Sequence, residues 1–203
     1  MSRHSTPPAS LRAQLAREAA RLMAENGIAD FALAKRKAAE RLRVDARGGM
    51  PTNSEVEEAL MAYQRLFRAE EQGDELVRLR RTALQVMRVL HDFSPRLIGP
   101  VLTGTADEHS GIQILVRVDP PESLSWFLTE RRLPHRNAER RLRFVRDHIE
   151  RIPAVEVMVD GIGVELLVLS GRHRTSTPLS PVDGRPMKRA SVKELEVMLE
   201  PHG

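Results

Sequence analysis

The sequence contains no cysteine and very few aromatic residues. Without cysteine, disulfide bonds, thiolate zinc sites and cysteine nucleophiles are all excluded. Aromatic residues make up only 3% of the 203 residues, so the stacking of bases on aromatic side chains is not expected to dominate nucleic-acid binding. The core must therefore consist mainly of Leu, Val, Ile, Met and Ala side chains.

Long apolar runs are also missing. The N-terminal stretch 1–8 lacks the apolar segment of a signal peptide, and no later segment approaches the length of a membrane span. We therefore expect a soluble, cytoplasmic protein without a membrane partner. Hydrophobic residues still make up 41% of the chain, which is enough to bury a core in one domain, or in a helical unit followed by an α/β unit.

Positive charge is concentrated in two places, although the formal net charge of the chain is only +4. The first is Lys35-Arg36-Lys37. The second is the stretch 131–146, in which Glu139 alone opposes seven arginines. Such patches can contact phosphate groups, but they are equally typical of the solvated outer face of a helix or strand. The candidate nucleic-acid contacts are Lys35, Arg36, Lys37, Arg140, Arg141 and Arg143.

The N-terminal half has the apolar periodicity of helices. Four helices are predicted. The first two span residues 10–26 and 31–42, the third begins at residue 54, and the fourth ends at about residue 92. Asp30 is a suitable cap for the second helix, and Ser54 with Glu57 has the spacing of a capping box for the third. Gly73-Asp74 is expected to break or bend the chain before the fourth helix.

The C-terminal half consists of short apolar runs separated by turns, which is typical of a small sheet. Strands are predicted over residues 97–103, 111–118, 140–146, 154–160 and 163–169. Asp160-Gly161 should form the tight turn between the last two strands. A helix is expected over 120–131, a loop over 170–190, and a closing helix after a capping box of Ser191 and Glu194.

The change from helices to strands near Ser94-Pro95 divides the chain into two regions. Residues 1–93 are expected to form an N-terminal helical region, and residues 94–203 an α/β domain. The predicted fold class is α+β, with a helical segment followed by a mixed β-sheet flanked by helices.

The most informative segment lies between residues 102 and 118 and reads LTGTADEHSGIQILVRV. An apolar strand is expected to end at Gly104-Thr105, and a second strand to follow Ser110 and pass through Gln113. A glycine lets backbone amides approach a phosphate, and a hydroxyl can donate to it. Gly104, Thr105, Ser110 and Gln113 are therefore candidate phosphate or nucleotide contacts. An ordinary glycine-containing strand end is the alternative.

This segment resembles the active-site hairpin of the nucleotidyltransferase superfamily. In that hairpin a Gly-Ser or Gly-Thr pair closes the first strand, and two carboxylates one residue apart open the second. Gly111 and Gln113 occupy the carboxylate positions here, and Glu165 matches the third carboxylate, which comes from a later strand. Residues 94–191, together with the helical segment 32–39, are similar to a family of bacterial proteins classed as nucleotidyltransferase-like. The resemblance implies a nucleotidyltransferase-like sheet with a degenerate metal-binding motif.

The resemblance also implies either Mg²⁺ with a nucleoside triphosphate as the cofactor or, with the metal ligands lost, no cofactor. Glycine supplies no ligand and glutamine only a neutral oxygen, so Glu165 is the one carboxylate left of three for a cation that prefers several oxygens. Asp107 and Glu108 could replace the missing ligands if their turn folded over the site, or they could simply be solvated turn residues. Glu165 is the candidate catalytic residue, with a surface-facing strand glutamate as the alternative.

These residues leave three functions open. The first is a catalytically degenerate nucleotidyltransferase-fold protein, a pseudoenzyme, with a nucleotide-binding, macromolecule-binding or regulatory role. The second is an active metal-dependent nucleotidyltransferase that acts on a protein, RNA or small molecule through Glu165 and one of Asp107 or Glu108. The third is a basic RNA-binding module. The partner is accordingly a nucleotide, an RNA or a protein, and the sequence indicates no oligomeric state.

Overall fold

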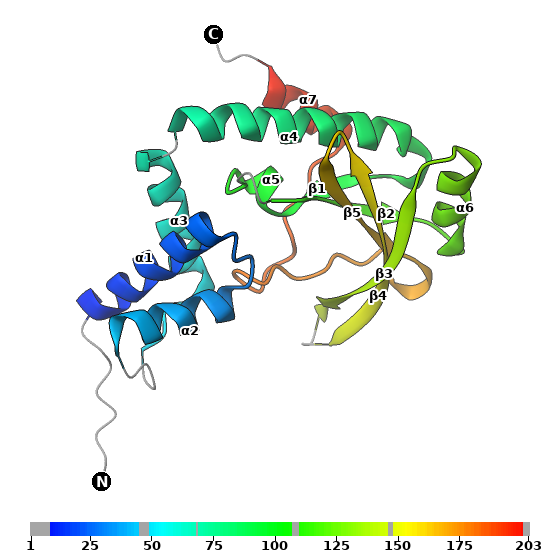
Figure 1. Cartoon of the computed structure of the whole chain (residues 1–203). Helices are drawn as coiled ribbons and strands as arrows, with labels where there is room; N and C mark the ends of the chain where they lie inside the picture. The colour runs from blue at the N-terminus through cyan, green and yellow to red at the C-terminus, as the bar shows by residue number, and fades with distance from the viewer. Residues whose placement is uncertain (1–8, 45–48, 68, 107–109, 146–147, 201–203) are drawn as a thin grey trace. The chain divides into compact units, whose positions relative to one another are not determined.

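The chain folds into two compact units, residues 1–73 and residues 74–203. The computed structural model in Figure 1 describes residues 9–44, 49–67, 69–106, 110–145 and 148–200. It is of mixed α and β composition, with helices before and around a five-stranded mixed sheet. The α+β class predicted from the sequence is thereby confirmed. Within the described ranges, no helix has both the length and the apolar character needed to cross a membrane.

The first unit is built on three helices, α1 (Ala9–Asn26), α2 (Phe31–Leu42) and α3 (Asn53–Phe67). The first helix contacts both of the others. Small side chains fill much of the helix interfaces and let the helix axes approach closely; the buried alanines are Ala16, Ala19, Ala20, Ala24, Ala34, Ala38 and Ala39. The predicted cap of α2 is confirmed, because Asp30 Oδ1 accepts a hydrogen bond of 2.8 Å from Leu33 N.

The capping box of α3 lies two residues earlier than predicted. Glu55 Oε2 accepts hydrogen bonds from Thr52 N at 2.6 Å and from Thr52 Oγ1 at 2.9 Å, and Thr52 Oγ1 accepts one from Glu55 N at 3.1 Å. Ser54 already lies in the first turn of the helix. Arg12 of α1 also donates to Glu55, and these bonds together lower the pKa of that carboxyl to about 2.

The predicted break at Gly73-Asp74 is wrong, because α4 (Ala69–Val89) continues through it. A glycine inside a helix costs only about 1 kcal/mol, and the residues after it are held by packing. The division between the two compact units falls at Gly73, inside α4, whereas the boundary expected at 93/94 followed the change from helices to strands. The later part of α4 belongs with the sheet because its apolar side chains enter the core of the second unit.

The sheet of the second unit has the strand order β1-β2-β5-β4-β3. All neighbours are antiparallel except β2 and β5, which are parallel. The strands are β1 (Arg96–Ile98), β2 (Ile112–Arg117), β3 (His135–Arg143), β4 (Ile149–Val159) and β5 (Ile162–Leu169). The helices after α4 are α5 (Gly99–Thr103), α6 (Glu122–Glu130) and α7 (Val192–Leu199), with short 3-10 turns at His91–Phe93 and Gly171–His173.

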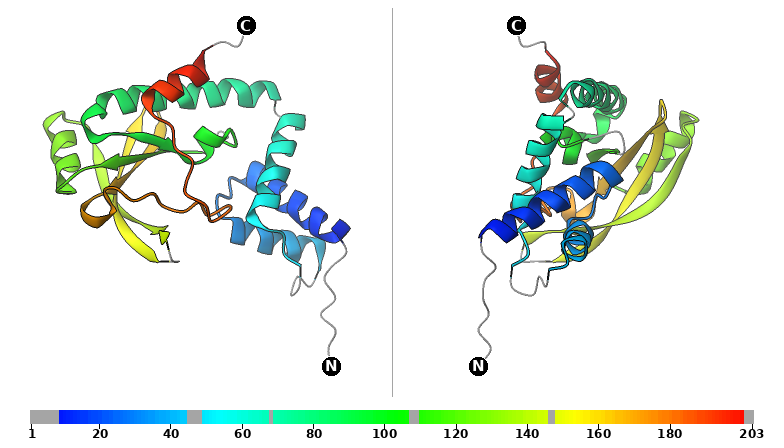
Figure 2. Two further views of the ribbon diagram at one scale, coloured as in Figure 1. Left: turned by 180° about the vertical axis from the view of Figure 1, so that it is seen from behind. Right: turned by 60° about the vertical axis from the view of Figure 1, so that its left-hand side comes forward.

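The two faces of the sheet are buried differently. One face contributes Ile114 of β2 and Leu166 of β5 to the larger core, which α4, α6 and α7 complete with Met87, Leu124 and Leu195. Figure 2 shows α4 and α7 side by side, and Arg88 donates to Glu196 across them at 2.7 Å. The opposite face carries a smaller apolar cluster, which includes Leu115, Leu142, Ile152 and Leu167. Part of that second face is therefore left to polar side chains.

The strand bounds differ from the prediction at three places, one of which is β4, since it begins at Ile149 and not at residue 154. The first strand ends at Ile98 and not at residue 103, because Gly99, at φ 72°, turns the chain and Pro100 begins α5. The third strand runs from His135 to Arg143, earlier than the predicted 140–146. Other predictions are confirmed, namely the helix within 120–131, the Asp160-Gly161 turn with positive φ at both residues, and the capping box of Ser191 and Glu194.

Leu166 provides a test of the larger core, since its side chain has no exposed surface. Leu166→Ala is expected to lower the free energy of unfolding by about 3 kcal/mol, through lost apolar burial and the cavity left behind. Met158→Ala is the matched control on the same sheet, because Met158 is 68% exposed, and it should change stability by less than about 0.5 kcal/mol. Urea denaturation followed by circular dichroism measures both, and equal losses would contradict the packing described.

Candidate functional site

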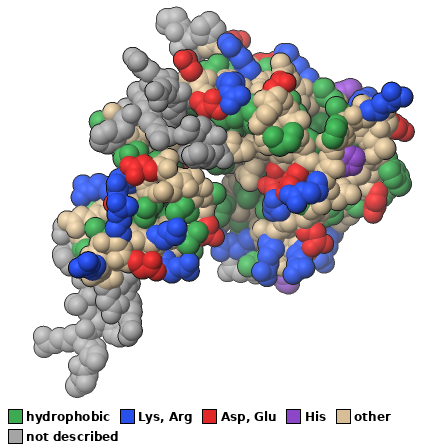
Figure 3. Space-filling model, viewed as in Figure 1, with side chains coloured by type: hydrophobic (Ala, Val, Ile, Leu, Met, Phe, Trp, Pro, Cys, Tyr) green, Lys and Arg blue, Asp and Glu red, His purple; other side chains and the backbone are tan. Residues whose placement is uncertain are grey.

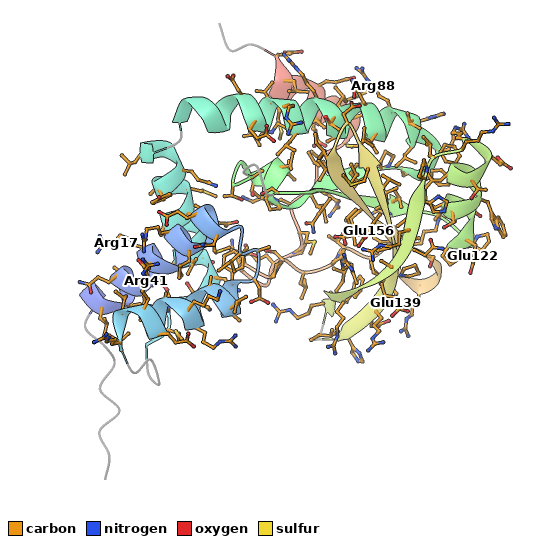
Figure 4. The ribbon with its side chains drawn as sticks, in the orientation of Figure 1. Arg17, Arg41, Arg88, Glu122, Glu139 and Glu156 are labelled. Carbon is orange, nitrogen blue, oxygen red and sulfur yellow. The ribbon has the colours of Figure 1, made fainter. Side chains whose placement is uncertain are left out.

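A row of polar side chains crosses the less buried face of the sheet. Strand register pairs Gln113 of β2 with Glu165 of β5, Glu165 with Glu156 of β4, and Glu156 with Arg136 of β3. Since paired residues project to the same face, these four side chains lie side by side across four strands. Arg140 of β3 projects to this face as well, four residues from Arg136. Figure 4 labels Glu156 at the centre of this group of strands.

Hydrogen bonds and ion pairs join the members of the row. Gln113 Nε2 donates to Glu165 Oε2 at 3.1 Å, and Arg140 Nε forms an ion pair with Glu165 Oε1. Arg140 Nη2 also donates to Glu156 Oε1 at 2.7 Å, while Arg136 Nε donates to Glu156 Oε2 at 3.0 Å. Two carboxylates are thus balanced by two guanidinium groups. The bond from Arg136, and then the charges of both arginines, lower the pKa of Glu156.

Burial is deepest at Glu165. Its side chain is 15% exposed, against 25% for Glu156 and 44% for Arg140. A carboxylate this well covered needs contacts to replace water. Glu165 Oε2 accepts a hydrogen bond from the Gln113 amide, whereas Oε1 forms an ion pair with the Arg140 guanidinium but has no hydrogen-bond partner among the described residues. Glu165 therefore faces a partner inside the protein and is not a solvated surface residue.

Gly99 is the glycine that approaches this row. A Cβ atom at Gly99 would lie 2.5 Å from Gln113 Oε1, so any other residue there would displace the Gln113 side chain. The pair that closes β1 is consequently Gly99-Pro100 and not Gly104-Thr105. The sequence carries a signal for this, because a Gly-Pro pair punctuates a strand.

Gly104 and Thr105 close α5 instead. Their two backbone N–H groups donate to the Pro100 carbonyl, at 2.9 and 3.1 Å, and Thr105 is buried. Arg80 of α4 adds hydrogen bonds to the carbonyls of Val101 and Leu102 at 3.1 and 3.2 Å. The amides expected to cradle a phosphate are therefore used within the chain. Ser110 lies two residues before the start of β2. The candidate metal ligands Asp107 and Glu108 lie outside the described residues.

Among the described residues, the surroundings of Glu165 do not supply the ligands that Mg²⁺ needs. A hard dication needs several oxygen ligands, but Gly111 has no side chain, and Gln113 presents an N–H donor to the carboxylate. The positive group beside Glu165 is the Arg140 guanidinium. Across the part of the chain that the structure describes, no cluster of three or more His, Asp or Glu side chains could hold a metal ion.

The candidate nucleic-acid contacts differ in their surroundings within each unit. Lys35 is used inside the first unit, where its Nζ donates to Pro51 O at 3.1 Å and to Asn53 Oδ1 at 2.8 Å, while Arg36 and Lys37 are exposed. In the second unit, the alternation of β3 puts Arg140 on the opposite face from Arg141 and Arg143. On the side of the molecule seen in Figure 3, basic side chains lie next to acidic ones.

Three members of the site were not singled out by the sequence, namely Gly99, Arg136 and Glu156. Glu156 could have been found from the two-residue turn at Asp160-Gly161, because that turn pairs Glu156 with Glu165. Neither a protein-family model nor a curated protein matches this chain. Function is therefore inferred from the geometry of the chain itself.

A double-mutant cycle on Arg140 and Glu165 tests whether this pair holds the row together. Glu165→Gln is expected to lower the free energy of unfolding by about 1–2 kcal/mol, because it removes a charged acceptor that is largely buried. Arg140→Gln in the Glu165→Gln background should cost less than in the wild type, with a coupling energy of about 1 kcal/mol.

The control cycle uses Arg151 and Glu139, whose side chains are 72% and 66% exposed and whose N–O distance is 3.6 Å. An ion pair so exposed is expected to couple by less than about 0.5 kcal/mol. Urea denaturation measures both cycles. Coupling at Arg140 and Glu165 no larger than in the control would mean that the pair does not stabilise the fold.

Proposed function

We propose that this chain is a nucleotidyltransferase-like protein that has lost metal-dependent transfer and keeps a binding role, toward a nucleotide or a macromolecule. The observation that carries the proposal is the contact set of Glu165. Where the resemblance implies a metal between carboxylates, Glu165 is held by the Gln113 amide and the Arg140 guanidinium. A guanidinium fixed to the sheet supplies positive charge but no open coordination position for a triphosphate.

The strand arrangement supports the nucleotidyltransferase part of the proposal. β1 and β2 are antiparallel neighbours joined through α5, and β5 lies parallel beside β2. Gln113 and Glu165 are direct partners in that register. A Cβ atom added at Gly111 would lie 3.2 Å from the Gly163 carbonyl oxygen, so Gly111 is close to β5 as well. Of the three positions that the resemblance assigns to carboxylates, Gln113 and Glu165 thus lie on adjacent strands, and Gly111 directly precedes β2.

The proposed loss of metal-dependent transfer rests on the side chains present at these three positions. Mg²⁺ in transfer enzymes neutralises the triphosphate and orients it, which requires negative ligands. Of the three positions, Gly111 and Gln113 contribute no charge, and the negative charge of Glu165 is already matched by Arg140. A nucleotide bound here would therefore have to be held without a metal ion between it and Glu165.

Thermal unfolding with ATP, GTP, CTP and UTP, each with and without Mg²⁺ or Mn²⁺, tests the loss of transfer. Any shift in the melting temperature Tm is expected to be independent of the metal, since a ligand raises Tm only through binding to the native state. Transfer of a labelled nucleotide should be absent. A metal-dependent shift together with product formation would overturn the proposal and support the active transferase, in which case Glu165→Gln should abolish the product.

Restoring the two missing carboxylates gives a second test. The double variant Gly111→Asp/Gln113→Asp should gain a Mn²⁺ site with Glu165, so that Mn²⁺ raises its Tm by a few degrees while leaving the wild type unchanged. The matched control adds Glu165→Gln to the double variant and should remove the shift. If Mn²⁺ stabilises the double variant and this triple variant equally, the three positions do not converge on one site.

A further inference from the structure

Three arginines gather at the far end of the same sheet face, away from the Gln113 end of β2. Arg96 begins β1, Arg117 ends β2, and Arg189 precedes the bridge between Ala190 and Leu97. Arg96 pairs with Leu115, so Arg117 is its diagonal neighbour, within reach of a long side chain.

The bridge brings Arg189 to the same face. Leu97 N donates to Ala190 O and Ala190 N donates to Leu97 O, both at 2.9 Å, so the segment lies beside β1. Leu97 and Ala190 both point into the larger core. Since side chains alternate along an extended chain, Arg96 and Arg189 project to the opposite face. Three segments remote in sequence thus contribute one arginine each.

The positive charges of this cluster are not matched. None of the three arginines forms an ion pair with another described residue; Arg96 donates to Pro95 O at 2.9 Å, and Arg189 Nη1 donates to Thr177 Oγ1 at 2.9 Å. Arg117 Nε is buried and has no hydrogen-bond partner among the described residues. Burial, and then the charges of Arg189 and Arg96, lower the pKa of Arg117.

Among the described residues, Glu194 is a carboxylate whose charge interacts with this cluster, and it is already engaged elsewhere. Glu194 Oε2 accepts hydrogen bonds of 2.7 Å from both the backbone N and the Oγ of Ser191, which cap α7. Those bonds are the main cause of its lowered pKa, with smaller contributions from Arg96 and Arg189. The carboxylate that interacts with Arg96 and Arg189 is therefore already engaged in capping a helix.

We propose that Arg96, Arg117 and Arg189 form a binding site for the phosphate group of a small phosphorylated ligand. The unpartnered Nε of Arg117 and the forked donors of three guanidinium groups match the oxygens of a phosphate. Thr177, positioned by Arg189, adds a hydroxyl that can donate. Arg117 lies four positions further along extended β2 than Gln113, roughly 13 Å, so this site is distinct from the Glu165 row. It does not depend on the proposed nucleotidyltransferase ancestry.

Isothermal titration and thermal unfolding with inorganic pyrophosphate, at constant ionic strength, test the site. Pyrophosphate is expected to bind the wild type and raise its Tm, and Arg117→Gln and Arg189→Gln should each weaken binding at least tenfold. Arg189 is exposed, so its replacement keeps the test valid if Arg117→Gln does not fold. Arg141→Gln is the matched control, because it removes the same charge from an exposed position on β3 and should bind as the wild type does.

Equal weakening by Arg117→Gln and Arg141→Gln would mean that net charge alone attracts the anion, and it would overturn the proposal, as would the absence of any binding. ATP in place of pyrophosphate separates the two sources of the phosphate. Tighter binding of ATP assigns a nucleotide, and equal binding assigns the phosphate group alone; both support the site. If pyrophosphate does not bind at these arginines, the metal-dependence tests of Glu165 remain valid.

A further variant distinguishes phosphate binding by Arg117 from a purely structural role in the sheet. Arg117→Met removes the buried, unpartnered Nε while keeping a long side chain, so without phosphate its Tm is expected to equal or exceed that of the wild type. The same variant should show no response to pyrophosphate. A lowered Tm combined with an unchanged response to pyrophosphate would show that Arg117 supports the sheet and does not bind phosphate.

Discussion

The parallel pairing of β2 with β5 is the constraint on which the rest of the second unit depends. One register aligns Ile114 with Leu166 toward the larger core and Gln113 with Glu165 on the other face. A slip of one residue would exchange the two faces, since side chains alternate along a strand, and it would bury Glu165 among aliphatic side chains. The same pairing that closes the core therefore also sets the polar row.

Much of the fold was predictable because its signals are local. The Asp30 cap, the Asp160-Gly161 turn and the Ser191 capping box each depend on residues within a few positions of one another. The short β1 and the charged β3 were harder. β1 has three residues, too few to show alternation, and the arginines of β3 obscure its period because the partners of Arg136 and Arg140 lie on other strands.

The candidate site, like the fold, was predictable from the sequence only in part. The resemblance singled out Gln113 and Glu165, which the strand register then makes direct partners. Arg140, by contrast, was grouped with nucleic-acid contacts, because a sequence shows a run of arginines but not the carboxylates that face it. The cluster of Arg96, Arg117 and Arg189 could not be predicted from the sequence, since it depends on β1, on the end of β2 and on a bridge at Ala190.

The edge position of β3 in the sheet has a consequence for the behaviour of the protein in solution. An edge strand offers unpaired backbone groups to other chains, and charged side chains on it discourage such pairing. β3 carries Arg136, Glu139, Arg140 and Arg141, and a strand added beside it would have to cover guanidinium groups that are bound to Glu156 and Glu165. The opposite edge, β1, is short and already bridged by Ala190. Both borders of the sheet thus resist self-association into extended β aggregates.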